Sequence, residues 1–217
     1  MNLAQEIEIL IRARYPILYI ASPEETRVQA MLVEIAQRRQ KKLFEWSCTT
    51  GIVPAGTSIQ SVKHRTAPTK DPLLALDQVI DHVEPAIFAF KDLHPFLTKT
   101  NFGVIRKLKE IAQHLKNSHK TIVLISPVVE IPAELEKEVT LLNLPMPVHG
   151  ELGQLLDKII GEIQQFSQVR IDLGPADRER LLQAALGLTL TEAENVFAKI
   201  IVKEERLTGE DVREVLA

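Results

Sequence analysis

Residues 16–32 read PILYIASPEETRVQAML, and this stretch decides how the rest of the chain is interpreted. Its first six residues are uncharged and apolar enough to form one short buried β-strand. Ser22 and Glu25 then have the spacing of a capping box, with Ser22 as the N-cap of a helix. Val28 and Leu32 fall on one face of that helix. The stretch therefore predicts a strand, a tight turn and an amphipathic helix.

The same alternation of strand and helix patterns continues to about residue 168. The predicted strands are Pro16–Ala21, Leu43–Cys48, Ala86–Phe90, Thr121–Ile125 and Val139–Leu144, and the main later helices are 72–83, 101–116 and 150–166. Residues 51–70 have early Gly and Pro breakers and predict a long loop, the segment that we expect to be cleaved first by proteases. Apolar strands that alternate with helices predict a three-layer α/β fold of the P-loop type, with a mainly parallel five-stranded sheet.

The pattern changes near residue 170. Residues 174–217 contain no strand candidate and carry the whole net charge of −3. Three short helices are predicted there, at Pro175–Leu186, Thr191–Glu204 and Gly209–Leu216. We therefore predict two domains: an α/β core at 1–168 and a small all-helical lid at 174–217, with the boundary at 168–174.

Composition excludes several classes of protein. The chain has 217 residues, of which 45% are hydrophobic and 25% charged, as in an average globular protein. It contains no apolar run of the roughly 18 residues that a membrane-spanning helix needs. One cysteine, Cys48, excludes an internal disulfide and a thiolate zinc cluster, and we expect its side chain to be a small buried hydrophobe. The near-neutral charge argues against a polycation for nucleic acid. Because there is no long apolar run and only one cysteine, we expect a cytoplasmic protein without a membrane span.

The turn after the first strand is where a phosphate-binding loop would lie in this fold. Residues 21–26 contain neither glycine nor lysine, and Glu24 and Glu25 would repel a triphosphate from the helix N-terminus. A magnesium site would need paired acids at the end of the third strand, but Lys91 stands beside Asp92 there. We expect Asp92 to pair with Lys91 or to cap a turn. Both positions predict that nucleotide is not bound in the usual manner.

Other motifs are weaker. Gly51–Ser58 has the glycine spacing of a phosphate loop but lacks its lysine, which favours a surface loop. The six histidines form no pair with metal-ligand spacing. The basic runs Arg38–Lys42 and Lys99–Lys109 are not interleaved with aromatic residues, which favours solvated faces over nucleic-acid binding.

The order of these pieces resembles an AAA-family ATPase. The similarity rests on the core segments Ile131–Leu135 and Asn143–Pro147 and on the lid segments Gly187–Glu194 and Leu207–Val212. More closely, Ile9–Ile20, Pro23–Glu25 and Phe44–Ser47 resemble the N-terminal half of the AAA-type ATPases of cyanobacteria and plastids that are known as a hypothetical chloroplast reading frame.

The resemblance implies that this chain is an N-terminal AAA-like domain, and the missing motifs lead us to expect that it is not an enzyme by itself. Under this hypothesis it has no catalytic, cofactor-binding or metal-binding residues, and ATP and magnesium belong to an active AAA module elsewhere. It would be a docking, regulatory or assembly module whose partners are that AAA module, a further copy of the chain or a client protein. The resemblance also implies a link to photosynthesis or inorganic-carbon use, in a cyanobacterial cytoplasm or a plastid stroma.

Two alternatives stay open. The first is an active ATP-binding AAA-type ATPase that uses a variant phosphate loop at Gly51–Ser58. The second is a nucleic-acid-binding regulator that uses the basic runs Arg38–Lys42 and Lys99–Lys109.

Overall fold

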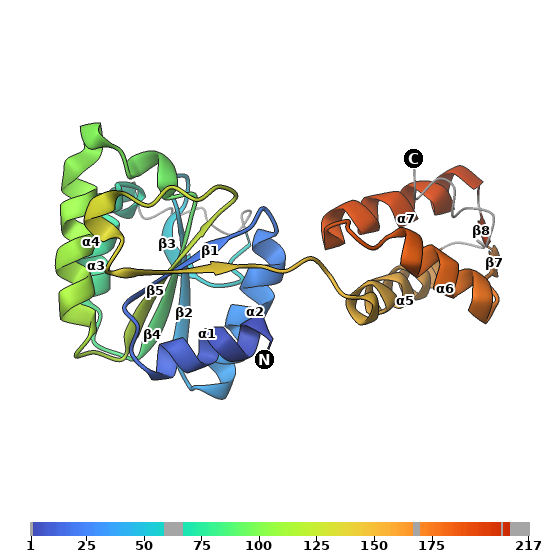
Figure 1. Ribbon diagram of the computed structural model, residues 1–217, viewed down its shortest axis with the longest axis horizontal. Coiled ribbons are helices and arrows are strands. Elements are labelled where there is room, and N and C mark those ends of the chain that lie inside the picture. Colours follow the sequence, from blue (N-terminus) through green and yellow to red (C-terminus); the bar gives the residue numbers. More distant parts are fainter. Residues whose placement is uncertain (1, 59–66, 167–169, 205, 209–217) are drawn as a thin grey trace. The chain divides into compact units, whose positions relative to one another are not determined.

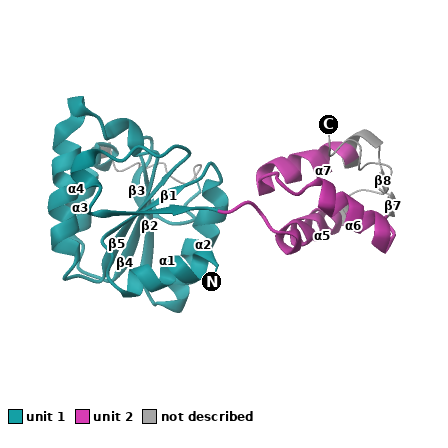
Figure 2. Cartoon of the chain, in the orientation of Figure 1, with its two compact units in different colours: residues 1–144 teal, residues 145–217 magenta. Residues whose placement is uncertain are grey.

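The computed structural model describes residues 2–58, 67–166, 170–204 and 206–208 (Figure 1). The chain divides into two compact units, residues 1–144 and 145–217 (Figure 2). The helices are α1 (Leu3–Arg12), α2 (Glu25–Arg38), α3 (Pro72–Asp81), α4 (Phe102–Leu115), α5 (His149–Phe166), α6 (Pro175–Ala184) and α7 (Leu190–Glu204). The strands are β1 (Ile17–Ala21), β2 (Lys42–Ser47), β3 (Gly51–Pro54), β4 (Ala86–Lys91), β5 (Lys120–Ser126), β6 (Val139–Asn143), β7 (Arg170–Asp172) and β8 (Arg206–Thr208).

The first unit is built on a six-stranded sheet with the order β3-β2-β4-β5-β1-β6. All neighbours pair in parallel except β2 and β3, which form an antiparallel hairpin. The α/β fold class is therefore confirmed, but the prediction of five strands is wrong because β3 lies in the segment predicted as a loop. Gly51 has a φ of 72°, which lets the chain turn into the hairpin, and Ile52 is then buried opposite Trp46.

Helices cover both faces of the sheet, as Figure 1 shows. On one face α3 and α4 pack against the alternate strand residues Tyr19, Phe88 and Ile122. On the other face α1 and α2 pack against the neighbouring residues Leu18 and Ile87. Both sets are buried because a central parallel strand has no solvent face, which explains the uncharged runs in the sequence.

The connections give the two edges of this sheet opposite polarity. We call the edge where β1, β4 and β5 end the carboxyl edge, and the edge where they begin the amino edge. Helices α2 and α4 each carry the chain from the carboxyl edge to the amino edge, and α1 and α3 also end at the amino edge. Helix N-termini carry partial positive charge and C-termini partial negative charge.

The second unit has its own small core. Leu152 and Leu156 of α5 are buried together with Leu181 of α6 and Phe197 of α7. The boundary thus lies at 144/145 and not at the expected 168–174, because the apolar face of α5 packs on α6 and α7.

The expectation that 174–217 contains no strand is also wrong. Arg206–Thr208 forms β8, which pairs in parallel with β7. Three apolar or β-branched positions in these two strands are too short a signal to predict a strand. The predicted helix Gly209–Leu216 lies outside the described residues. Across the described part of the chain, no helix is both long and apolar enough to cross a membrane.

Candidate functional site

The carboxyl edge of the sheet is the first place to look for a site. In open α/β sheets, ligands bind beyond the carboxyl ends of the strands, near the point where the strand order reverses. Here β1 lies between β5 and β6, and the chain leaves β1 in one direction and returns to its other side with β6. The segments after β1, β4 and β5 therefore meet at this edge.

The turn after β1 is closed by its own residues. The Ser22 hydroxyl accepts a hydrogen bond of 2.9 Å from the Glu24 N–H, and the Ser22 N–H donates to the Ser126 carbonyl at 2.8 Å. Glu24 is 7% exposed and pairs with Arg27 at 3.2 Å. The helix begins at Glu25 with Glu24 as its N-cap, so the prediction of Ser22 as the N-cap is wrong. Pro23 and Glu24 therefore belong to the turn, and the helix starts after them.

Lys91 lies at the end of β4, at this edge. Its ammonium lies 3.0 Å from Glu45 Oε2 and 3.6 Å from Glu25 Oε2, and it donates to the Gln29 side chain at 3.1 Å. The expectation that Lys91 pairs with Asp92 is wrong, because Asp92 has a φ of 52° and its carboxylate lies 3.9 Å from the His94 ring nitrogen. The left-handed backbone at Asp92 turns the chain so that the two neighbouring side chains diverge.

The arrangement around Lys91 sets the local electrostatics. One ammonium is shared by two carboxylates, so the cluster of Lys91, Glu25 and Glu45 has a formal charge of −1. The Gly56 N–H also donates to Glu45, at 3.2 Å. A phosphate group could use Lys91 only after the ammonium had released these carboxylates, because an anion is repelled by the pair as it stands.

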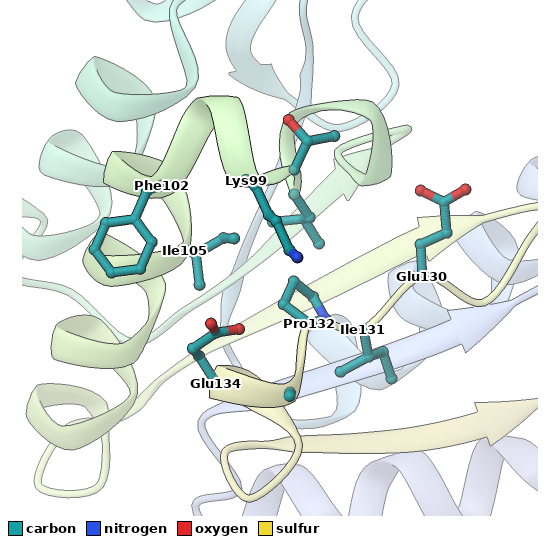
Figure 3. Close-up of a pocket in the computed structure, with 10 residues that line it drawn as sticks. Lys99, Phe102, Ile105, Glu130, Ile131, Pro132 and Glu134 are labelled. Atoms are coloured by element: carbon teal, nitrogen blue, oxygen red, sulfur yellow. The ribbon is translucent and has the colours of Figure 1, made fainter.

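A groove opens between the start of α4 and the segment after β5 (Figure 3). Its volume is about 680 Å³. It is lined by Leu97–Lys99, Phe102, Ile105 and Glu130–Glu134. The buried Tyr19 of β1 holds the far wall: its hydroxyl donates to the Val128 carbonyl at 2.7 Å and accepts from the Glu130 N–H at 3.3 Å.

The groove combines an apolar floor with charges at its rim. Leu97 and Ile105 are buried, whereas Phe102 is 55% exposed. Figure 3 shows the Lys99 side chain extending across the groove toward Pro132. Lys99, Glu130 and Glu134 are all exposed, and none of the three makes an ion pair with another residue that the structure describes. A protein surface could therefore satisfy both the apolar and the charged parts of this groove.

The other sequence candidates lie elsewhere. Residues 51–54 are strand β3, and the described residues up to Ser58 contain no helix start, so the glycine spacing at Gly51–Ser58 does not form a strand–loop–helix phosphate loop. Cys48 is exposed in the turn between β2 and β3, so the prediction that it is buried is wrong.

Most cations of the two basic runs have acidic partners. Arg38 and Arg39 reach Glu8 at 3.1 Å and 2.6 Å, and Lys42 pairs with Glu84. In the second run, Arg106 binds Glu110 at 2.8 Å and Lys107 pairs with Asp77. Among the described residues there is no cluster of three or more His, Cys, Asp or Glu side chains that could hold a metal ion.

One buried charge was missed in the sequence. Lys120, at the start of β5, is 6% exposed, and its ammonium donates to the carbonyls of Val79, Ile80 and His82 at 2.7–2.8 Å. It closes the C-terminal end of α3, and burial lowers the pKa of its ammonium. In the sequence, Lys120 is a lysine directly before an apolar strand. That pattern fits a solvent-exposed strand end equally well, so it does not predict a buried ammonium.

Comparisons with known proteins agree with this architecture. The sequence matches the N-terminal domain of SpoVK-like AAA ATPases over residues 3–144 and the second domain of these ATPases over residues 150–217. The chain therefore belongs to the family of SpoVK-like AAA ATPases. The boundary between the two matched domains falls where the structure divides the chain.

Two relatives and two solved structures illustrate the match. The chain is 29% identical over 220 residues to an uncharacterized AAA domain-containing protein ycf46 of Trieres chinensis and 28% identical over 215 residues to that of Guillardia theta. The two matches include 100% and 98% of this chain but only 41% and 40% of the length of the relatives. The fold is similar to C. elegans PCH-2, with a TM-score of 0.61, 11% identity and coverage of 99% of this chain and 66% of that one. It is also similar to the FIGL-1 AAA domain in complex with ADP, with a TM-score of 0.60, 11% identity and coverage of 98% and 75%.

These matches bear on two sequence-based predictions. The resemblance to AAA-type ATPases of the ycf46 kind is confirmed. The prediction that the chain is not an enzyme is wrong, because the family to which it belongs is a family of ATPases and its structural neighbours are AAA domains.

Proposed function

We propose that this chain works within an ATP-hydrolysing AAA protein, and that residues 1–144 bind another AAA module through the groove between α4 and the segment after β5. The observation that supports this most directly is the lining of the groove. An apolar floor and the exposed ring of Phe102 are surrounded by Lys99, Glu130 and Glu134, which lack ion-pair partners among the described residues. Such a surface matches a protein partner with an apolar anchor and charges of both signs.

The partner is an AAA module either of the same protein or of a further copy. The chain spans about two fifths of the length of the relatives that it matches, at 41% and 40%. The rest of those relatives is therefore a natural source of the partner surface. Location in a cytoplasm or plastid stroma, assembly into a homo-oligomer, and a link to photosynthesis or inorganic-carbon use stay predictions.

The test compares two truncations of exposed apolar side chains. Phe102→Ala removes the anchor at the groove, whereas Leu74→Ala removes a side chain of similar exposure (48%) that does not line it. We expect Phe102→Ala to raise the Kd between this chain and the AAA module about tenfold or more. In the whole protein the same substitution should change the rate of ATP hydrolysis. Leu74→Ala should change neither. Equal effects of the two variants would contradict docking at this groove.

A second candidate function is ATP binding by this chain itself, at the carboxyl edge of the sheet. Membership of an ATPase family and the fold shared with an ADP-bound AAA domain favour it. Calorimetric titration of the purified chain with ATP and magnesium decides it. Micromolar binding that is abolished by Asp92→Ala, at the end of β4, would support this candidate. Micromolar binding that persists in that variant would place ATP elsewhere on the chain.

A further inference from the structure

A second cavity lies at the amino edge of the sheet, away from the groove. It is formed where α1 runs into β1, where the chain enters β6, and where α4 ends. Its volume is about 360 Å³, and it is lined by Ala13–Pro16, Lys116, Lys137, Glu138 and Thr140. We call it the basic pocket. Its size falls within the range of about 300–1,000 Å³ that is typical of small-molecule sites.

The lining of the basic pocket is strongly cationic. Arg14, Lys116 and Lys137 contribute three positive charges, and Glu138 is the one acid among the lining residues. Glu138 lies 3.4 Å from Lys116. Arg14 and Lys137 make no ion pair with any residue that the structure describes, which leaves a formal charge of +2 at the pocket.

Arg14 occupies a backbone position that normally selects glycine. Its φ is 60°, and the Tyr15 and Arg14 N–H groups donate to the Leu10 and Ile11 carbonyls at 3.0 and 3.2 Å. This is the Schellman arrangement that ends a helix, in which the left-handed residue is usually glycine because any Cβ is strained there. Arg14 thus brings its guanidinium to the pocket from a backbone position at which glycine would be less strained.

Helix dipoles explain only part of this charge. Arg14 and Lys116 follow the last turns of α1 and α4, where a cation also offsets the partial negative charge of the helix end. Lys137 lies in the turn before β6 and follows no α-helix end. A helix dipole therefore does not account for the presence of Lys137 at this cavity.

We propose that the basic pocket binds a small organic phosphate. A phosphate monoester carries a charge of about −1.5 to −2 at neutral pH, which matches the formal +2 of the lining. The guanidinium of Arg14 suits bidentate contacts to phosphate oxygens, and the ammonium groups of Lys116 and Lys137 add point charges. Tyr15, which is 42% exposed, presents a ring against which the carbon part of the ligand packs. Thr140 adds a hydroxyl at the rim.

The test is calorimetric titration of the intact chain with ribose 5-phosphate, inorganic phosphate and ribose. We expect ribose 5-phosphate to bind more tightly than inorganic phosphate, and ribose not to bind. Lys137→Ala and Arg14→Gly should each raise the Kd for ribose 5-phosphate about tenfold, because each removes one charge-assisted contact. Glycine suits the backbone of position 14, so this variant keeps the fold.

Gln40→Gly is the matched control. Gln40 also has a left-handed backbone (φ 51°) after a helix, but it does not line the basic pocket. Its substitution should leave the Kd unchanged. A Kd that is equal in Lys137→Ala and in the unmodified chain, or the absence of any binding of ribose 5-phosphate, would overturn the proposal. Equal Kd values for inorganic phosphate and ribose 5-phosphate, with no effect of Tyr15→Ala, would overturn the claim that the pocket recognises the organic part of the ligand.

Discussion

The carboxyl and amino edges of the central sheet differ in what surrounds their positively charged side chains. At the carboxyl edge the ammonium of Lys91 is held by carboxylates, of which Glu45 is the nearest, at 3.0 Å. At the amino edge the buried Lys120 is held by three backbone carbonyls, while Arg14 and Lys137 face a cavity. At the first edge the strand-end cation Lys91 is neutralised within the fold, whereas at the second edge Arg14 and Lys137 keep their charge available.

The difference follows from how the helices run. Helices begin at the carboxyl edge, where Glu24 and Glu25 complement the positive end of α2; Arg27 then pairs with Glu24, and Lys91 pairs with Glu25. Helices end at the amino edge, where free carbonyls need donors and lysine or arginine supplies them. In this fold, some cations at the amino edge cap the C-terminal ends of helices. Cations at that edge that cap no helix are candidates for ligand binding.

The largest effect is expected at the amino edge, for Lys120→Met. The substitution leaves the carbonyls of Val79, Ile80 and His82 without their buried donor. We expect a loss of about 3 kcal/mol in the free energy of unfolding, measured by urea denaturation. Lys42→Met is the control, because Lys42 and its partner Glu84 are each 56% exposed. That variant should cost less than about 1 kcal/mol, and a similar cost for both would show that burial of Lys120 is unimportant.

At the carboxyl edge, Lys91→Met should cost somewhat less. It leaves Glu45, which is 14% exposed, facing Glu25 without a cation. We expect a loss of about 2 kcal/mol, between the values for surface and buried pairs. Adding Glu45→Gln should recover part of this loss because it removes one of the two like charges. A double-mutant cycle measures the coupling, and strict additivity would contradict the shared ion pair.

Glycine substitutions at two helix ends should stabilise the chain modestly. Arg14 and Gln40 both have left-handed backbones, so Arg14→Gly and Gln40→Gly should each add about 1 kcal/mol to the free energy of unfolding. For a unit of this size that is a rise of about 2–4 °C in Tm, measured by circular dichroism. Unchanged or lower Tm values would show that the side chains make contacts that outweigh the strain.

The smallest effect is a pH dependence from His82. Burial lowers the pKa of its imidazole, whose ring packs edge-on against Phe44 and Phe88 at 5.1 and 5.4 Å. The folded state therefore favours neutral His82, and its stability should fall as the pH drops below the ordinary value of about 6.5. His82→Phe keeps the aromatic packing and should flatten the Tm-against-pH curve between about pH 7 and 5. An unchanged slope would assign the acid sensitivity to other groups.

The sheet could be predicted from the sequence because β1, β4 and β5 contain uncharged runs bounded by charged or turn residues, such as Ala86–Phe90 before Lys91. The edge hairpin could not, since Gly51–Pro54 is four residues long and its strand character depends on pairing with β2. The boundary at 144/145 was missed for a similar reason. The apolar face of α5 has the same pattern whichever core it packs against, so periodicity does not say to which unit it belongs.

The candidate sites depended even more on tertiary structure. The acids after β1 were recognised, but the partner of Lys91 was not, because Glu45 is 46 residues away in the sequence. The groove and the basic pocket each join segments that are far apart in the chain, such as 97–105 with 130–134 and Arg14 with Lys137. In the sequence, Arg14, Lys116 and Lys137 are isolated basic residues, and nothing in their spacing predicts that they line one pocket.

Trp46 gives the molecule a built-in optical label. It is the single tryptophan of the chain, 1% exposed, with its indole N–H donating to the Thr69 carbonyl at 2.6 Å and its ring beside Phe90. Both tyrosines, Tyr15 and Tyr19, also belong to residues 1–144, so tyrosine and tryptophan emission report on that unit alone. Far-ultraviolet dichroism records helices from both units. Recording the two signals during one denaturation therefore separates the melting of residues 1–144 from that of residues 145–217 without any added dye.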